Sequence, residues 1–307
     1  MAKNHQTDQS KTILITGGSG LVGTRLSELL SEKGYKVTHL SRNPKNKKFK
    51  TYYWDLAKEE IDAEAITSAD AIVHLAGAGV ADKRWNEARK KEIYDSRINS
   101  TQLLLAKVKE LNPKLSYFLS ASAIGYYGWD TGDRLVDEST AKGDGFLADV
   151  VADWEKEASK FKEESVSIGS VRVGVVLSEK GGALVEIAKP IRLGFGAPLS
   201  SGNQYMSWVH LDDLCHVFIH MLENKVEQVV NGVAPQPVTN KVLTKAIAKQ
   251  LGKPLFLPNV PTFALRLMVG EMADMLVGGN NVSSKKIEEL GFTFQYPKLD
   301  QALQHLL

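Results

Sequence analysis

A glycine pattern near the N-terminus constrains the fold of this chain more than any other feature. Residues 16–23 read TGGSGLVG and stand between a short β-branched run, residues 13–15, and a segment whose leucines fall near helical spacing. In such a strand–loop–helix context, the first glycine permits a tight turn, the second lets a pyrophosphate approach the backbone, and the third allows close packing of helix on strand. Free N–H groups at the helix start attract phosphate. The motif predicts a dinucleotide-binding loop made of Gly17, Gly18, Ser19, Gly20, Leu21, Val22 and Gly23.

The pattern beyond this loop predicts the rest of the architecture. Apolar, mostly β-branched runs at 13–15, 36–40, 71–75, 117–119 and 167–173 alternate with amphipathic segments, as in βαβ units. After about residue 174, clusters of Gly and Pro make the pattern irregular. We therefore expect an α/β protein with a Rossmann-like doubly wound parallel sheet and a smaller C-terminal α+β lobe. The expected parts are a disordered tail at 1–11, a Rossmann domain that binds NADP at 12–175, and a substrate lobe at 176–307, from which segments can return to the Rossmann domain.

Composition and charge limit the kinds of partner that this chain can bind. The formal net charge is only +2, and acids and bases are interspersed, so no nucleic-acid partner is expected. The single cysteine, Cys215, excludes an internal disulfide and a cysteine-built zinc site, and the histidines show no metal-ligand spacing. No apolar run approaches the roughly 18 to 20 residues of a membrane span. The sequence predicts a cytoplasmic protein with a small-molecule substrate, no metal and no membrane partner. Residues 265–277 are apolar on more than one side, which is typical of a buried or interface helix and leaves a homodimer open.

The end of the second predicted strand bears on the choice of cofactor. A site for NAD carries an acidic residue there, which binds the ribose 2′-hydroxyl, whereas this chain has Ser41 and Arg42. Arg42 can pair with a 2′-phosphate, and the Ser41 hydroxyl can donate another hydrogen bond. The pattern favours NADP(H) over NAD(H); an exposed arginine in a basic loop is the alternative.

Several further segments match a known family in order. Asp55-Leu56, the sequence HLAG at 74–77, Asn99 with TQLL at 101–104, and WVHLDD at 208–213 resemble the extended short-chain dehydrogenase/reductases, the NAD-dependent epimerase/dehydratase family. A narrower resemblance is to an atypical branch of this family, the YfcH-like proteins of nucleoside-diphosphate-sugar epimerase type, which have a C-terminal extension. The matching segments are Arg84-Trp85, Ser96-Arg97, the run 171–177 and the ending 282–307. The resemblance implies that the cofactor is also contacted by Asp55, Leu56, Leu75, Ala76, Gly77, Glu92, Arg97, Ser120 and Val176. For Glu92 and Arg97 the alternative is that they form ion pairs on the surface.

The resemblance also shows where the chain departs from active members. Those proteins use a Tyr-xxx-Lys pair on one helix face, in which the lysine makes the tyrosine a better acid. In the expected helix at 146–155, Leu147 and Val151 occupy these positions. Ser122 matches the serine that polarises a substrate carbonyl, and Tyr126 or Tyr127 is a candidate for the missing acid. Capping of the strand by Ser122 and aromatic packing of the tyrosines are the alternatives.

Two functions remain open on the sequence. One is an NADP-dependent oxidoreductase or epimerase-like enzyme, whose substrate lies between the lobes near residues 194–204, Trp208, His210 and Asn231. The other is a catalytically silent protein that binds NADPH or senses redox state. A purely structural scaffold ranks last, because it would not need the glycines and Ser41-Arg42 together.

Overall fold

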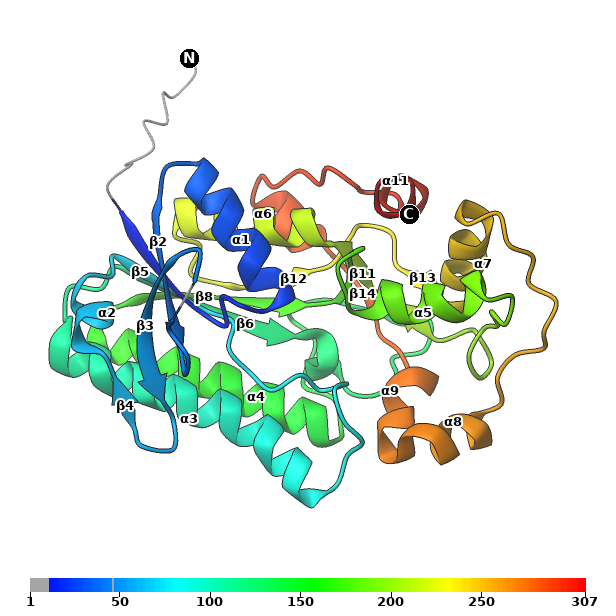
Figure 1. Cartoon of the computed structure of the whole chain (residues 1–307), viewed down its shortest axis with the longest axis horizontal. Coiled ribbons are helices and arrows are strands. Elements are labelled where there is room, and N and C mark those ends of the chain that lie inside the picture. Colours follow the sequence, from blue (N-terminus) through cyan, green and yellow to red (C-terminus); the bar gives the residue numbers. More distant parts are fainter. Residues whose placement is uncertain (1–10, 46) are drawn as a thin grey trace, which may run out of the picture.

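A mostly parallel eight-stranded sheet forms the centre of the computed structural model (Figure 1). The structure describes residues 11–45 and 47–307, so the tail predicted at 1–11 lies, apart from Lys11, outside the described residues. Neighbouring strands are parallel except β4, which pairs antiparallel with β3 at one edge. In spatial order the strands are β12 (Val229–Gly232), β8 (Ser167–Val173), β6 (Tyr117–Ala123), β5 (Ala71–His74), β1 (Thr12–Thr16), β2 (Lys36–Ser41), β3 (Lys50–Asp55) and β4 (Glu60–Ile61).

Helices cover both faces of the sheet. On one face, α1 (Leu21–Glu32) and α6 (Leu211–Asn224) pack side by side over Ile13 and Ile15 of β1. On the other face, Leu14 and Ile72 pack against a second helical layer. Because successive residues of β1 point to opposite faces and both faces are covered, all five of its residues are buried. The second layer contains α2 (Ala63–Thr67), α3 (Glu87–Leu111), α4 (Phe146–Ser159) and the 3₁₀ helix η2 (Lys160–Glu164).

The remaining elements gather mainly at one end of this sandwich (Figure 1). A separate apolar core joins α5 (Ala183–Arg192), α7 (Asn240–Gln250) and α11 (Leu299–Leu306). Three small two-stranded sheets pair β9 (Val175–Leu177) with β11 (Trp208–His210), β10 (Tyr205–Met206) with β13 (Val238–Thr239), and β7 (Leu135–Val136) with β14 (Asn281–Val282). The short helices are η1 (Ile124–Tyr127), α8 (Thr262–Val269), η3 (Gly270–Ala273), α9 (Asp274–Val277) and α10 (Lys285–Glu289). The predicted Rossmann-like fold with additional C-terminal elements is confirmed, and α6 and β12 are the later segments that lie in its layers.

The apolar segment 265–277 is not the one continuous buried or interface helix that its composition suggests. It is divided into the end of α8, then η3 and α9, because Gly270 has φ +65° and ends α8. Leu265 is buried, but Leu267 and Met268 are 79% and 68% exposed. Within the described residues, none of the helices combines the length and the apolar character that crossing a membrane requires.

Candidate functional site

The glycine loop is packed too closely to accept side chains. Gly17 has φ +70°, and a Cβ atom there would lie 2.8 Å from the carbonyl carbon of Leu75. A Cβ atom on Gly23 would lie 2.3 Å from the Gly17 carbonyl oxygen, which already accepts a hydrogen bond from the Gly20 amide at 3.0 Å. These contacts hold the start of α1 directly against the end of β1.

The first turn of α1 has the chemistry of an anion site. Gly20 is the N-cap residue, and no side chain caps the helix there. Helix geometry leaves the amides of Leu21 and Val22 without intrahelical acceptors, and the first turn holds no acidic residue. The helix dipole and these N–H groups therefore favour a bound phosphate.

The side chain of His39 packs against the glycine loop at Gly18. The imidazole lies so close to Gly18 that a Cβ atom there would come within 2.6 Å of the ring. Its Nε2 hydrogen-bonds the Ser27 hydroxyl at 2.7 Å. Burial lowers the pKa of His39 to about 4, so the ring is neutral at pH 7 and supports the loop by packing rather than by charge.

The register of the sheet places the predicted site residues along one edge. Thr16 of β1 is paired with Leu40 on one side and with His74 on the other. The pairing continues from Leu40 to Tyr52 and from His74 to Ser120. The carboxyl ends of these strands, with Asp55 and Ser122, and the segments after them, with Arg42 and Ala76, therefore lie at the same edge as the glycine loop, where ligands of such sheets bind.

Arg42 is the free cation at this edge. Its side chain is exposed and has no hydrogen bond or ion pair within the described residues. Ser41 is partly occupied, because its hydroxyl donates to the Asn43 carbonyl oxygen at 3.2 Å and accepts from the Asn43 amide at 3.1 Å. Asp55 accepts hydrogen bonds from the Tyr53 hydroxyl and the Ala57 amide, which stabilise the turn after β3 and lower its pKa against the effect of desolvation. The half-buried Leu56 packs against the neighbouring core.

The loop after β5 is tied to β1 by Thr16. Its hydroxyl oxygen accepts from the amides of Leu75 and Ala76, each at 3.2 Å, and bonds Nδ1 of His74 at 2.7 Å. The other ring nitrogen of His74 bonds Ser100 of α3 at 3.1 Å. Burial lowers the pKa of His74 to about 3, so this buried link is neutral.

The two candidates on α3, Glu92 and Arg97, differ in their surroundings. Arg97 lies beneath Gly77 and donates from Nη1 to the carbonyl oxygens of Ala78 and Ile93, at 3.1 and 2.9 Å. It has no carboxylate partner in the described chain, and burial lowers its pKa to about 10. Glu92 is instead paired with Arg89 at 2.5 Å, which lowers the Glu92 pKa. Arg97 is therefore placed to meet an anion at the loop, whereas the ion-pair account fits Glu92.

A buried polar network lies behind the candidate catalytic serine. The Ser122 hydroxyl donates to Oε1 of Glu155, on α4, at 2.5 Å. Glu155 also accepts two hydrogen bonds from Arg172 of β8, at 2.8 and 2.9 Å. Arg172 donates further, from Nη1 to the Tyr127 hydroxyl at 3.1 Å. The network joins β6, α4, β8 and η1 around one guanidinium.

The two tyrosines of η1 have different environments. The Tyr127 hydroxyl donates to Oδ1 of Asn231 at 2.8 Å, and burial raises the pKa of Tyr127 to about 12. The ring of Tyr126 lies over the Arg172 guanidinium, 3.4 Å from the ring centre. Tyr126 is half-buried, and its hydroxyl has no hydrogen-bond partner within residues 11–45 and 47–307. Tyr126 is therefore the phenol that remains free to meet a ligand.

The face of α4 toward η1 is apolar at the positions that the family resemblance assigns to a Tyr-xxx-Lys pair. Leu147 packs in a cluster with Trp129, Met272 and Met275, and Val151 is buried. Glu155 follows one turn later and belongs to the network above. A Cβ atom on Gly125 would lie 3.4 Å from the Leu147 Cβ, so this part of α4 packs closely against η1.

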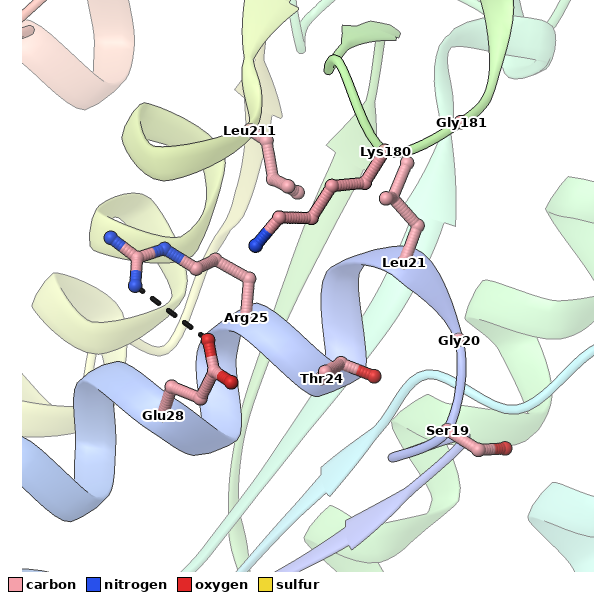
Figure 2. Close-up of a pocket in the computed structure, with 9 residues that line it drawn as sticks. All are labelled: Ser19, Gly20, Leu21, Thr24, Arg25, Glu28, Lys180, Gly181 and Leu211. Atoms are coloured by element: carbon pink, nitrogen blue, oxygen red, sulfur yellow. Dashed lines mark ion pairs between the residues drawn. The ribbon is translucent and has the colours of Figure 1, made fainter.

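Figure 2 shows a pocket of about 290 Å³ beside the glycine loop. Lys180 reaches across it from the loop after β9, whereas the Ser19 hydroxyl points away. Arg25 in its wall is bound by Asp212 through hydrogen bonds of 2.7 and 3.0 Å. The pocket thus borders the predicted phosphate site on the flank of α1 that faces α6. Its lining residues are Ser19, Gly20, Leu21, Thr24, Arg25, Glu28, Lys180, Gly181 and Leu211.

Other predicted positions have structural partners. Ser120 is buried, and its hydroxyl donates to the Ala121 carbonyl oxygen, while half-buried Val176 pairs with Val209 between β9 and β11. Trp208, His210 and Asn231, suggested as cleft residues, are each 1% exposed or less. His210 accepts from the Asp212 amide at the start of α6, so it caps that helix.

Glu155 and Arg172 were not singled out from the sequence. The signal was an arginine in the otherwise apolar run 171–177, since a buried charge requires a partner. Nothing in the sequence identified which acid would supply it, because the partner lies on another element.

Comparison with known proteins places this geometry in a family context. The model of the "NAD dependent epimerase/dehydratase family" matches residues 13–233, and a "domain of unknown function (DUF1731)" matches residues 260–306. Epimerase family protein Mb2239 of Mycobacterium bovis is 36% identical over 297 residues, which cover 95% of this chain and 96% of the relative. Human epimerase family protein SDR39U1 is 33% identical over 299 residues, covering 96% and 99% of the two chains.

Solved structures agree with the sequence matches. The crystal structure of human SDR39U1 (isoform 2) with NADPH superposes with a TM-score of 0.87 and 33% identity, covering 96% of this chain and 98% of that one. UDP-glucuronic acid 4-epimerase from Bacillus cereus, solved with UDP-glucuronic acid and NAD, has a TM-score of 0.78, 18% identity, and coverage of 96% and 98%. The second likeness concerns the fold.

Proposed function

Because the chain belongs to the NAD-dependent epimerase/dehydratase family, we propose that it binds NADP(H) at the glycine loop and acts as an epimerase-like oxidoreductase. The observation that carries the proposal is that the uncapped start of α1 and an exposed cation without an ion pair, Arg42, lie at the same edge of the sheet. The NADPH in the human SDR39U1 structure supports it.

A cytoplasmic location is part of the proposal, supported by the single cysteine, which leaves no internal disulfide to form.

The preference for NADP(H) rests on charge. A 2′-phosphate at the end of β2 would meet the unpaired guanidinium of Arg42. The residues at this position, Ser41 and Arg42, include no acid that could bind a 2′-hydroxyl. Arg97, under the loop at Gly77, supplies a second cation that has no carboxylate partner in the described chain. The amides of Leu21 and Val22 would hold the pyrophosphate between these cations.

The nicotinamide, when bound, supplies hydride transfer. The chain's own part is to handle the substrate oxygen, and Tyr126 is the group best placed for it. Its hydroxyl has no hydrogen-bond partner in the described chain, and its ring is held in place over the Arg172 guanidinium. Ser122 donates to Glu155, so it can accept a hydrogen bond from the substrate or from Tyr126 while that contact persists.

A second candidate function is a protein that binds NADPH without turnover. Leu147 and Val151 favour it, because they occupy the helix positions where related enzymes carry the Tyr-xxx-Lys pair, and neither can move a proton. In this reading the cofactor site reports NADPH level or redox state.

The test is a calorimetric titration of the full chain with NADPH and with NADH. Oxidation of NADPH is then followed against a panel of carbonyl compounds and nucleotide sugars. Tight NADPH binding with turnover that Tyr126→Phe abolishes supports the enzyme and its proton donor. Tight binding without turnover supports the silent protein, and absence of binding to either dinucleotide contradicts both.

A further inference from the structure

Large apolar side chains are exposed almost entirely at one end of the molecule. Of the nine that are exposed in the described residues, eight lie between residues 193 and 268, and only Leu135 lies elsewhere. We call this group the apolar end. It consists of Leu193, Phe195, Val242, Phe256, Leu257, Phe263, Leu267 and Met268.

Two segments of the apolar end lie side by side. Leu199 and Val260 form a β-bridge, and the Ser200 amide donates to the Val260 carbonyl oxygen at 2.8 Å. A Cβ atom on Gly196 would lie 2.9 Å from Cδ2 of Leu255. The loop after α5 therefore runs beside the connection from α7 to α8, at the end of the molecule opposite β3 and β4 (Figure 1).

Helix α8 presents its apolar residues to solvent. Phe263 and Leu267 are one helical turn apart and 74% and 79% exposed. Leu265 is the buried residue that anchors α8 to the protein. A monomeric protein rarely exposes such a concentration of large apolar side chains unless the surface binds something.

The segment that carries most of these residues has charges of one sign. Residues 240–268 contain four lysines and one arginine and no acidic residue. Lys241, Lys245 and Lys249 repeat every four residues on the exposed side of α7, and Lys253 follows in the loop. None of these four lysines has a hydrogen bond or an ion pair from its side chain within the described ranges. Of the bases here only Arg266 is paired, with Asp274 at 3.1 Å.

We propose that the apolar end docks on the surface of an anionic phospholipid bilayer. Exposed Phe, Leu and Met at the same end of the molecule as unpaired lysines are the chemistry of interfacial membrane binding, in which apolar side chains enter the headgroup region and lysines contact anionic lipid. A protein partner fits less well, because protein–protein interfaces are depleted in lysine. The expectation of no membrane partner rested on the absence of a spanning segment, and docking on the surface needs none. The proposal is independent of the cofactor site.

The experiment is co-sedimentation of the full chain with phosphatidylcholine vesicles, with and without phosphatidylglycerol. The native protein is expected to bind the anionic vesicles, less at high salt, and to bind the neutral vesicles at least tenfold more weakly. The variant Phe263→Ser with Leu267→Ser should lower the partition coefficient on anionic vesicles at least tenfold. Lys249→Glu with Lys253→Glu should do the same, since each lysine near an anionic surface contributes about fivefold in affinity.

Matched controls test whether binding depends on the apolar end itself or only on total exposed apolar area or total charge. Leu135→Ser removes the exposed large apolar residue outside the apolar end, and Lys114→Glu reverses an exposed charge in the turn before β6. Both should bind like the native protein, and circular dichroism should show every variant folded. Absence of native binding to anionic vesicles overturns the proposal, as does equal loss in the controls. Concentration-dependent self-association that Phe263→Ser with Leu267→Ser abolishes, without vesicle binding, would assign the face to a second copy instead.

Discussion

The carboxylate of Glu155 accepts two hydrogen bonds from the Arg172 guanidinium, from Nε at 2.8 Å and from Nη2 at 2.9 Å. The Arg172 side chain is 4% exposed and that of Glu155 is 14% exposed, so both charges are largely removed from water. The energetic consequence is asymmetric. Loss of one partner leaves the other charge buried without compensation, whereas joint replacement by apolar groups removes both desolvation costs.

We therefore expect Arg172→Met to lower the free energy of unfolding by about 3–5 kcal/mol. Glu155→Met should cost a similar amount, because it leaves the guanidinium unpaired. The double variant should cost less than the sum of the two single variants. Urea denaturation of the four proteins in a double-mutant cycle measures the coupling, and an additive cycle would contradict the account of the pair.

Two glycines allow the stability cost of a close contact to be separated from the cost of a positive φ. Gly17 and Gly252 have φ of +70° and +63°, but a Cβ atom at Gly17 would meet Leu75, whereas nothing lies within 4 Å at Gly252. Gly252→Ala should therefore cost only the left-handed backbone term, about 1 kcal/mol. Gly17→Ala should cost about 1–3 kcal/mol more through overpacking, and it should weaken NADPH binding.

Chemical denaturation and NADPH titration of both variants give the comparison. NADPH affinity of Gly252→Ala should equal that of the native protein. Equal unfolding costs for the two alanines would show that the loop tolerates a side chain, against the packing described here.

Local sequence was sufficient for the glycine loop and the main strands because both depend on neighbouring residues. TGGSGLVG fixes the turn by its glycines, and the buried runs around Ile15, Val37 and Ile72 are short and β-branched. Strand β3 was missed, because its sequence KTYYWD has no aliphatic residue, begins and ends on a charged residue, and has only two buried residues. Its strand character comes from pairing with β2.

Contacts between distant elements were beyond local reasoning. The Glu155–Arg172 pair joins α4 to β8, and the Arg89–Glu92 pair removes Glu92 from the free groups expected at the cofactor. The sequence could place Tyr126 and Tyr127 beside Ser122, but their difference arises from the positions of Arg172 and Asn231 in space. The break at Gly270 likewise depends on its φ of +65°, and composition alone shows no such value.

His39 makes stability depend on pH. Burial lowers its pKa from an ordinary 6.5 to about 4, with a smaller effect of Lys47. Because the unfolded chain binds a proton more readily, the contribution of His39 is complete above pH 6.5 and is lost as pH falls toward 4. In that window His39 should add a slope of about 1.4 kcal/mol per pH unit.

The measurement compares urea denaturation of the native protein and His39→Gln at several pH values in this window. Glutamine does not titrate, and its side chain can bond Ser27. The variant should therefore show a shallower loss of stability with acid, by about 1.4 kcal/mol per pH unit. Parallel curves would mean that His39 has an ordinary pKa in the folded protein.

Arg42 should discriminate between the two dinucleotides. Its guanidinium follows the last residue of β2 and has no partner in the described chain, so a 2′-phosphate would gain a charged hydrogen bond there. Loss of such a bond costs about 1.5–3 kcal/mol, or roughly 10- to 150-fold in affinity. Arg42→Ala should therefore weaken NADPH by that factor and leave NADH nearly unchanged. Lys36→Ala is the matched control, because it removes an exposed positive charge at the opposite end of the same strand. Calorimetric titration of both variants with both dinucleotides decides the matter, and equal losses of NADPH and NADH in Arg42→Ala would exclude Arg42 as the 2′-phosphate ligand.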